Sequence, residues 1–488
     1  MEINPKIMNS HEHLSTYNVK FLHFIQQNPE YLNAGHYGIM ELNDPLFKLQ
    51  PWPTFISRKT KNEVKEANLE VLDLLRSIPS RFFDNDPGKI SRYYNVSPDL
   101  ANYFLYGVTP DHIANLLSRG DFVITDSGLK CIEFNINTNL GGMNLSLWES
   151  LSLAVPAISR FLQENNITTT NRNIYSVLFE QLVQVADRFY QHPGDVNIAI
   201  VMPGNMEDPF RHVHEKGLNS IYRGVMGTRF NRRGGRVFIC NYSQLNVMGS
   251  DVFLNGEKVH YIVEWCQGFV PRDILRLFKQ EKILICNGAI AWPLSTKINL
   301  ALLSENIDSG LFSPKEKETI EKYVPWTRKV VPGVTTYEGE SVNLVEFMLS
   351  NREKLVLKPI LGAGGKGIHI GIHTPEEQWK KLVELALAAD DWRDVQLGED
   401  LTEEQWYRIA GKAFTVENWL VQEYVEPSTY IYQLGENGYG EHHAVWGFFI
   451  FGSAYAGGWG RVLPTNNDCG IINCHQGAKV SVIFEVDE

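Results

Sequence analysis

Residues 354–372 read KLVLKPILGAGGKGIHIGI, and this stretch decides the fold class that we expect. An apolar run ends at Lys358 and is followed by a loop with four glycines between positions 362 and 367. Glycines adopt positive φ angles and let backbone N–H groups approach an anion closely. Because Lys358 and Lys366 flank the glycines, the composition favours a polyphosphate ligand.

The residues after the loop separate two classes of nucleotide site. Gly362, Gly364 and Gly367 match G-x-G-x-x-G, a pattern that is weak alone and that needs a following helix in dinucleotide-binding folds. Residues 368–372 instead alternate like a strand. We therefore predict a β-hairpin over 355–372, with a loop that is mobile without nucleotide. A glycine-rich hairpin without any ligand is the alternative.

Two other phosphate-binding patterns are excluded by the sequence. Protein kinases also use a glycine-rich hairpin, but the chain contains neither H-R-D nor D-F-G. A P-loop requires Ser or Thr after its Gly-Lys pair, and Gly367 follows Gly365-Lys366 here.

A second segment, residues 419–427, reads WLVQEYVEP and predicts a strand interrupted by Gln422 and Glu423. The backbone of such a strand could pair with an adenine edge, while a carboxylate accepts from a ribose hydroxyl or the adenine amine. An edge strand with solvated polar residues would look the same.

A third segment predicts two antiparallel strands within 120–136, joined by a turn at 126–128. Glu133 and Asn135 are two residues apart, so their side chains share one face, and the pairing could bring Asp121 near them. We expect Ile132, Phe134 and Ile136 to face the core. Carboxylate and amide oxygens on one face suit Mg²⁺ held jointly with ATP phosphates, although a plain amphipathic hairpin would alternate in the same way.

A fourth segment, residues 287–300, contains Ser295 as a candidate helix cap and Lys297 in the expected first turn of that helix. A cation is mildly unfavourable at a helix N-terminus, so a lysine there is easier to explain if it reaches an anion. A surface lysine that extends into solvent is the alternative.

The chain length and the order of patterns predict an α/β organisation in three parts. The chain has 488 residues, which is too many for one hydrophobic core. We expect a helical N-terminal region over 1–190 that contains the 121–136 hairpin, a small open-sheet α/β lobe over 191–290, and further lobes over 291–488. Periodicity predicts helices near 62–78, 172–190, 272–279, 295–305 and 375–390, and strands near 197–202, 236–240, 260–265, 282–286 and 418–485.

Composition and termini point to a soluble, cytoplasmic chain. The net charge of −12 lowers the expectation of a nucleic-acid partner and gives no reason to expect an anionic membrane surface. The N-terminus lacks the basic and apolar regions of a signal peptide. The six cysteines are expected to be buried free thiols, and Cys469, Cys474 and His475 lack zinc-site spacing.

The four segments in this order resemble the circularly permuted ATP-grasp enzymes, such as the ATP-grasp domain of glutathionylspermidine synthetase and eukaryotic-type glutathione synthetase. In that group the metal-binding E-x-N precedes the glycine loop, as Glu133-Phe134-Asn135 precedes Gly362 here. The first ~110 residues match nothing in the group, and no amidase-like domain is present, so the substrates of those enzymes do not transfer.

The resemblance implies a role for each matching residue. Asp121, Glu133 and Asn135 correspond to metal ligands, Lys297 and Lys358 to lysines that reach ATP phosphates, and Arg461 to an arginine near the transferred phosphoryl group or the substrate carboxylate. Gly362, Gly364, Gly365, Lys366 and Gly367 correspond to the loop over the phosphates. The adenine strand corresponds to Gln422, Glu423, Tyr424 and Val425.

The resemblance therefore implies an ATP- and Mg²⁺-dependent ligase that joins a carboxylate to an amine through an acylphosphate and releases ADP and phosphate. The expected partners are small molecules (an amino acid, peptide or polyamine), with a homodimer suggested by the related enzymes. A phosphotransferase and a non-catalytic nucleotide-binding regulatory protein are the alternatives, although none of Asp121, Glu133, Asn135, Lys297 and Lys358 is missing.

Overall fold

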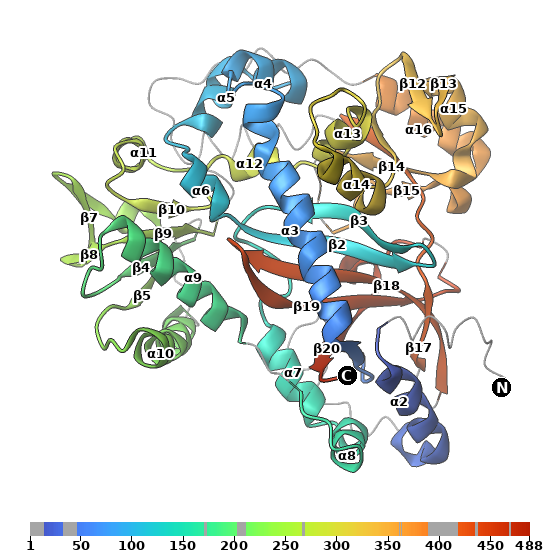
Figure 1. The fold of residues 1–488 in the computed structure, drawn as a ribbon, viewed down its shortest axis with the longest axis horizontal. Coiled ribbons are helices and arrows are strands. Elements are labelled where there is room, and N and C mark those ends of the chain that lie inside the picture. Colours follow the sequence, from blue (N-terminus) through green and yellow to red (C-terminus); the bar gives the residue numbers. More distant parts are fainter. Residues whose placement is uncertain are drawn as a thin grey trace.

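The structure is a computed structural model that describes residues 14–32, 46–169, 173–202, 211–265, 269–360, 362, 364–388, 418–434, 438–467 and 470–488. Its described strands form a seven-stranded central sheet, two four-stranded sheets and two smaller ones. Helices surround these sheets (Figure 1). The architecture is α/β, as predicted from the sequence.

The central sheet combines strands from both ends of the chain. Its order is β1-β20-β19-β18-β2-β3, and β17 also pairs with β18. The pair β1–β20 is parallel and the other pairs are antiparallel. The strands are β1 (Thr54–Ser57), β2 (Leu117–Thr125), β3 (Gly128–Asn135), β17 (Thr429–Leu434), β18 (Gly438–Phe451), β19 (Ala454–Pro464) and β20 (Lys479–Val486).

The long helix α3 (Arg58–Arg81) crosses the central sheet (Figure 1). Ser57 caps it by accepting a hydrogen bond from the N–H of Thr60, which satisfies one of the free donors of the first turn. Val64, Val71 and Ile78 lie on its buried stripe. Helices α7 (Leu145–Leu153) and α9 (Ile174–Phe189) also pack against strands of this sheet.

A second sheet is parallel, with the order β10-β9-β4-β5. Its strands are fully buried, which explains why each reads as a short, continuous apolar run. The strands are β4 (Ile198–Val201), β5 (Val237–Cys240), β9 (Tyr261–Glu264) and β10 (Leu284–Cys286), with helices α10 (Arg211–Phe230) and α11 (Arg272–Lys279) in the connections.

The third sheet has a hydrophobic core of its own. Its order is β11-β16-β14-β15, with every pair antiparallel. Leu357 and Val421 of this sheet pack with Phe347 and Trp379 of the helices α15 (Leu344–Ser350) and α16 (Glu376–Leu387). The strands are β11 (Thr327–Lys329), β14 (Leu355–Pro359), β15 (His369–Ile370) and β16 (Trp419–Glu423).

The other elements connect these units or lie at the periphery. The strands are β6 (Asn246–Met248), β7 (Asp251–Leu254), β8 (Glu257–Val259), β12 (Val334–Tyr337) and β13 (Glu340–Asn343). The α-helices are α2 (Thr16–Gln27), α4 (Pro87–Tyr94), α5 (Pro98–Leu105), α6 (Pro110–Ala114), α8 (Pro156–Glu164), α12 (Ala291–Leu294), α13 (Ile298–Glu305) and α14 (Pro314–Tyr323). The 3₁₀ turns are η1 (Pro29–Leu32), η3 (Tyr242–Gln244), η4 (Arg352–Lys354), η5 (Gly371–His373) and η6 (Cys474–Gln476).

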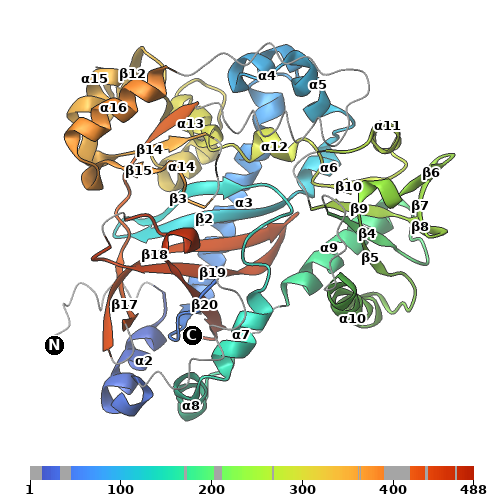
Figure 2. The same cartoon turned by 180° about the vertical axis from the view of Figure 1, so that it is seen from behind.

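The two ends of the described chain meet at one side of the central sheet. Helix α2 and strand β20 lie close together from both directions of view (Figure 2), and Ser15 donates a hydrogen bond of 2.5 Å to Glu488. None of the helices in the described ranges is both long and apolar enough to span a bilayer.

The predicted helices and strands are confirmed within a few residues of their expected bounds. The three-part division along the sequence does not separate three sheets in space, because β2 and β3 pair with β18 from the C-terminal part. Among the described cysteines, Cys131, Cys240, Cys286 and Cys474 are buried free thiols, as expected. Cys266 and Cys469 lie outside the described residues.

Candidate active site

A cavity of about 590 Å³ lies where the central, parallel and third sheets meet. It is lined from β2 and β3, from β14 and β16, from β19, and from the end of β9. Every residue for which we predicted a role lines it except Gly367, which lies in the adjoining turn.

The glycine segment forms the predicted β-hairpin, but its second strand is shorter than expected: β15 covers His369–Ile370, and residues 371 and 372 belong to the 3₁₀ turn η5. Strand β14 pairs with β15 in antiparallel register, Val356 opposite Ile370, and no helix begins between residues 364 and 367. The dinucleotide-binding alternative is therefore wrong. Gly364 and Gly365 have φ angles of 71° and 75°, in the left-handed region that favours glycine.

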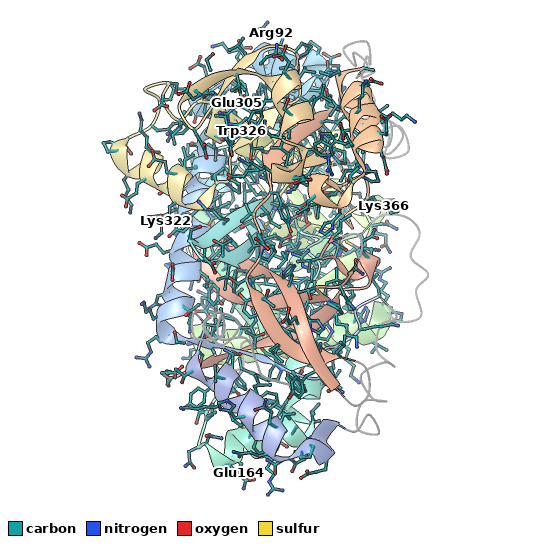
Figure 3. All side chains as sticks on the ribbon, turned by 90° about the vertical axis from the view of Figure 1, so that its right-hand side faces the viewer. Arg92, Glu164, Glu305, Lys322, Trp326 and Lys366 are labelled. Atoms are coloured by element: carbon teal, nitrogen blue, oxygen red, sulfur yellow. The ribbon has the colours of Figure 1, made fainter. Side chains whose placement is uncertain are left out.

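The glycine loop packs against residues 470–476. A Cβ atom placed on Gly364 would lie 2.7 Å from Cδ2 of His475, and one on Gly365 would lie 2.8 Å from Cγ2 of Ile471. Both glycines therefore allow a close approach as well as a turn. Lys366 is exposed at the edge of the molecule (Figure 3).

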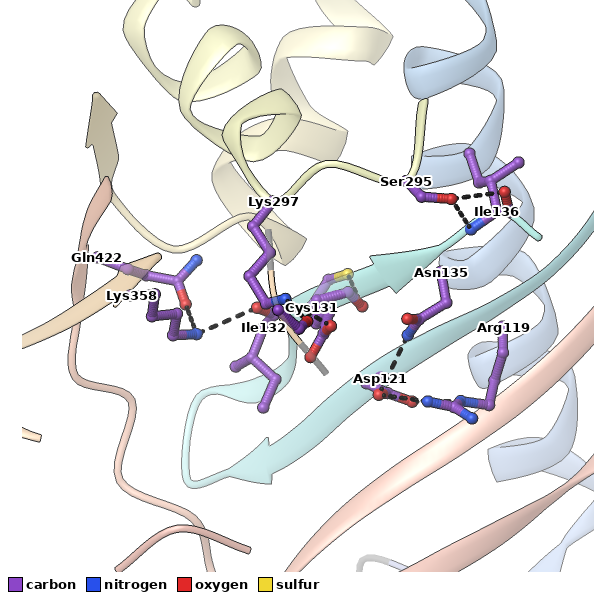
Figure 4. Close-up of polar contacts among 12 residues, drawn as sticks. Arg119, Asp121, Cys131, Ile132, Asn135, Ile136, Ser295, Lys297, Lys358 and Gln422 are labelled. Atoms are coloured by element: carbon purple, nitrogen blue, oxygen red, sulfur yellow. Dashed lines mark hydrogen bonds and ion pairs between the residues drawn. The ribbon is translucent and has the colours of Figure 1, made fainter. Parts of the chain in front are cut away.

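Two buried lysines converge on strand β3 (Figure 4). Lys297 places its Nζ 3.1 Å from Oε1 of Glu133 and donates a 2.8 Å hydrogen bond to the carbonyl of Gly362. Lys358 donates to Oε1 of Gln422 at 2.6 Å and to the carbonyl of Ile132 at 3.2 Å. Lys297 thus connects the hairpin that carries Glu133 to the glycine loop.

The environment of Lys358 favours its neutral form. Its pKa is lowered to about 8, chiefly by burial; Glu133 opposes this shift and the charge of Lys297 adds to it. An anion bound beside Lys358 would stabilise the protonated lysine.

Asp121 is held by two arginines. Arg119 makes a bidentate contact with it, with 2.8 Å from Nε to Oδ1 and 2.9 Å from Nη2 to Oδ2. Nη2 of Arg461 lies 2.9 Å from Oδ2. Burial would raise the pKa of Asp121, but the two arginines together lower it below its ordinary value. Its oxygens are committed to guanidinium groups, which departs from the predicted metal-ligand role.

Glu133 and Asn135 lie on the cavity side of β3, as predicted. The side chain of Glu133 is 26% exposed, and Nδ2 of Asn135 donates to Oδ2 of Asp121 at 3.3 Å. The prediction that Ile132 faces the core is wrong. A bulge between the pairs Asp121–Glu133 and Phe122–Cys131 leaves Ile132 without a strand partner, so it lines the cavity while Cys131 is buried.

Ser295 does not cap the start of the following helix, as predicted; it is the C-terminal cap residue of α12. It follows α12, accepts a hydrogen bond from the N–H of Ile136 and donates one to its carbonyl, so it joins the end of β3 to this segment. Lys297 immediately precedes α13 rather than lying in its first turn.

The next question is whether the oxygens of Asp121, Glu133 and Asn135 suit a Mg²⁺ ion. Among the described residues, no three His, Cys, Asp or Glu side chains form a ready-made metal site. Mg²⁺ usually keeps several waters and binds through one or two carboxylates plus substrate phosphates. Glu133 and the amide oxygen of Asn135 fit that pattern, whereas Asp121 does not.

Strand β16 and the residues after it line one wall of the cavity, as predicted for Gln422 to Val425. The N–H groups of Glu423 and Tyr424 already donate to the carbonyls of Trp326 and Lys354. Within the described part of the chain, the N–H of Val425 has no acceptor. An adenine edge could therefore use this N–H and the neighbouring carbonyl groups.

Several cavity residues were not predicted from the sequence. Arg119 precedes Asp121 by two positions, so the alternation that selected Glu133 and Asn135 could have identified it. Glu264 ends a strand that reads as apolar, and His475 lies in the short 3₁₀ turn η6. Neither carries a local signal that marks it as part of a site.

The site thus belongs to an α/β protein that brings lysines, a carboxylate and a glycine hairpin into one cavity. The same fold occurs in a glutathione synthetase-like effector from Globodera pallida in its apo form, with a TM-score of 0.54, 12% identity, and coverage of 96% of this chain and 98% of that one. A candidate gamma-glutamylcysteine synthetase from Methylobacillus flagellatus gives a TM-score of 0.38 at 11% identity, covering 85% and 87%. No family model and no curated protein matches the sequence.

Proposed function

We propose that the chain is an ATP- and Mg²⁺-dependent ligase of the circularly permuted ATP-grasp kind, which joins a carboxylate to an amine through an acylphosphate. The observation that carries the proposal is the meeting of Lys297, Lys358 and Glu133 under the glycine hairpin. The order along the chain, with the Glu133 hairpin before the glycine loop, supports the permuted arrangement.

Lys297 and Lys358 would hold the β- and γ-phosphates of ATP beneath the backbone N–H groups of the glycine loop. Both side chains are buried, so their charges act in a medium that screens them less than water does. Fixed positive charge around the transferred phosphoryl group is the main catalytic contribution in phosphoryl transfer. Gln422 holds Lys358 in place through its 2.6 Å hydrogen bond.

The arginine pair would orient the acid. Arg119 and Arg461 carry two positive charges against the single negative charge of Asp121, so the cluster retains a net charge of about +1. A substrate carboxylate or the transferred phosphate can bind to that excess charge.

The proposed ligase reaction has two steps. A carboxylate oxygen attacks the γ-phosphorus, the bond to the β-phosphate oxygen breaks, and ADP leaves with that electron pair. The amine nitrogen then attacks the acyl carbon, the bond from that carbon to the phosphate oxygen breaks, and phosphate leaves while the nitrogen loses a proton to solvent or a base. Glu133 and Asn135 would hold Mg²⁺, which when bound neutralises charge on the phosphates.

The test is product analysis with a trapping nucleophile. The full chain is incubated with ATP, Mg²⁺, hydroxylamine and each acid from a matrix of amino acids and short peptides. The proposal expects a hydroxamate and stoichiometric ADP with at least one acid, and loss of both in Arg461→Ala. Formation of AMP and pyrophosphate would contradict the acylphosphate, and ADP formation that requires a hydroxyl acceptor would indicate a phosphotransferase.

A further inference from the structure

The parallel sheet has a feature that marks ligand sites in open α/β sheets. From β4 the chain passes to β5 on one side and then to β9 on the other, so the strand order reverses at β4. Ligands in such sheets bind outside the carboxyl ends of the strands at the point of reversal. Strand β9, next to β4, ends at Glu264.

Glu264 is the charged group that this lobe contributes to the cavity. Of the described residues in 191–290, Glu264 and Asn287 line it. The amide of Asn287 is engaged with the backbone of Leu117, accepting at 2.7 Å and donating at 2.9 Å. Glu264 is only 2% exposed, so its carboxylate lies in a protected part of the cavity.

A second acceptor of the cavity comes from the segment that contacts the end of β9. The hydroxyl of Thr138 donates to the main-chain carbonyl of Glu264, which ties residues 137–139 to the end of β9. Oδ1 of the adjacent Asn137 is buried and has no hydrogen-bond donor among the described residues. A buried acceptor without a donor costs free energy unless a ligand supplies one.

Elsewhere the cavity is lined by the cationic side chains of Arg119, Lys297, Lys358, Lys366 and Arg461 and by three further carboxylates, Asp121, Glu133 and Glu423. Asp121 is paired with the two arginines and Glu133 with Lys297, in the regions proposed to bind carboxylate and phosphate. Glu264 and Asn137 therefore form an acceptor-rich end that suits a donor carrying positive charge.

We propose that Glu264 and Asn137 bind the ammonium group of a small-molecule substrate, so that the site selects a ligand with a protonated amine within reach of the arginine pair. The choice of a small-molecule acid or amine as the ligand rests on the proposed ligase function. The ammonium could belong to the acid that is activated or to the acceptor amine, and the two sources are separated by the test.

The test is isothermal titration calorimetry on the full chain with Mg²⁺ and a non-hydrolysable ATP analogue. The probes are matched pairs with and without the amine: L-alanine with propionate, L-glutamate with glutarate, and putrescine with butanediol. In wild type the amine-bearing member of at least one pair should bind at least tenfold more tightly than its analogue. Discrimination within an amino acid pair assigns the ammonium to the acid, and discrimination within the putrescine pair assigns it to the acceptor.

Variants connect this preference to Glu264. Glu264→Gln should abolish it, Glu264→Asp should retain part of it, and Glu281→Gln, which removes an exposed carboxylate of the same lobe, should not change it. Equal affinity within all three pairs in wild type, or undiminished discrimination in Glu264→Gln, would overturn the inference. A chain that discriminates through Glu264 but releases ADP with no acid would keep this inference and contradict the ligase function.

Discussion

Asp121 on β2 and Arg461 on β19 form a buried ion pair across the intervening strand β18. Gly447 lies opposite Asp121 on β18 and makes this contact possible. A Cβ atom at that position would lie 3.1 Å from Oδ1 of Asp121 and 3.0 Å from Cδ of Arg119. The missing side chain lets the acid and the arginines meet over the sheet.

Asp121→Asn is therefore expected to destabilise the protein. The substitution leaves two buried guanidinium groups without a counter-charge, and breaking a buried pair from one side costs about 3–5 kcal/mol. Urea unfolding of the variant should show this loss. A loss below about 1 kcal/mol would show that the cluster is solvated like a surface ion pair.

The pH dependence of stability gives an independent measurement. The pKa of Asp121 is lower in the folded protein than in the unfolded chain. Asp121 therefore adds to the free energy of unfolding above the ordinary aspartate pKa, and this contribution is lost as the pH falls through the pKa of the folded state. Acid unfolding of wild type should therefore contain a component that Asp121→Asn lacks. Lys89→Ala, which removes an exposed ion pair with Asp84, serves as the control with little effect.

The sequence predicts both hairpins of the site because each depends on local information. Alternation places Glu133 and Asn135 on one face, and the glycines with the strand-like residues after them predict the hairpin of β14 and β15. These features need only the periodicity of a strand and the conformational freedom of glycine.

The rest of the site depends on contacts between distant parts of the chain. The pairing of Asp121 with Arg461 requires β19 to lie two strands from β2, which no local pattern specifies. The bulge at Ile132 shifts the alternation by one residue, and strict periodicity therefore places that side chain on the wrong face. Glu264 enters the cavity because its sheet meets the central sheet, and its own strand does not indicate this.

Gly364→Ala is expected to weaken nucleotide binding for two separable reasons. A φ of 71° is strained for alanine, at a cost of roughly 1–2 kcal/mol, and the new methyl group would collide with His475. His475→Ala removes the collision and leaves the strain. Fluorescence titration with an ATP analogue should show partial recovery of affinity in the double variant. Full recovery would mean that the loop accepts alanine without strain.

Lys358 should make nucleotide binding depend on pH. Its pKa of about 8 means that Lys358 in the free site is half neutral near that pH and mostly neutral above it, whereas phosphates favour the charged lysine. Binding should therefore take up protons at pH values above about 8, and affinity should fall as the pH rises further. Calorimetry in buffers of different ionisation enthalpy measures the uptake. Lys358→Met should abolish it, and unchanged uptake in that variant would assign the proton to another group.

Glu133→Gln separates two roles that the structure allows for this carboxylate. Glu133 pairs with Lys297 and raises the pKa of Lys358, so it could act on the lysines alone. In that case the variant would bind the nucleotide with a lower Lys358 pKa but would need no more Mg²⁺ than wild type.

If Glu133 also holds Mg²⁺, the Mg²⁺ concentration for half-maximal ADP release should rise by about tenfold or more, because a charged oxygen ligand is replaced by an amide. The fold should remain intact, since the side chain is partly exposed and glutamine has the same shape. Glu423→Gln is the matched control, because it removes a carboxylate from the cavity wall proposed to bind adenine and should change the affinity for ATP without changing the Mg²⁺ requirement. An unchanged Mg²⁺ requirement in Glu133→Gln, together with a lower Lys358 pKa, would assign Glu133 to the lysines and leave the metal to the phosphates and other oxygens.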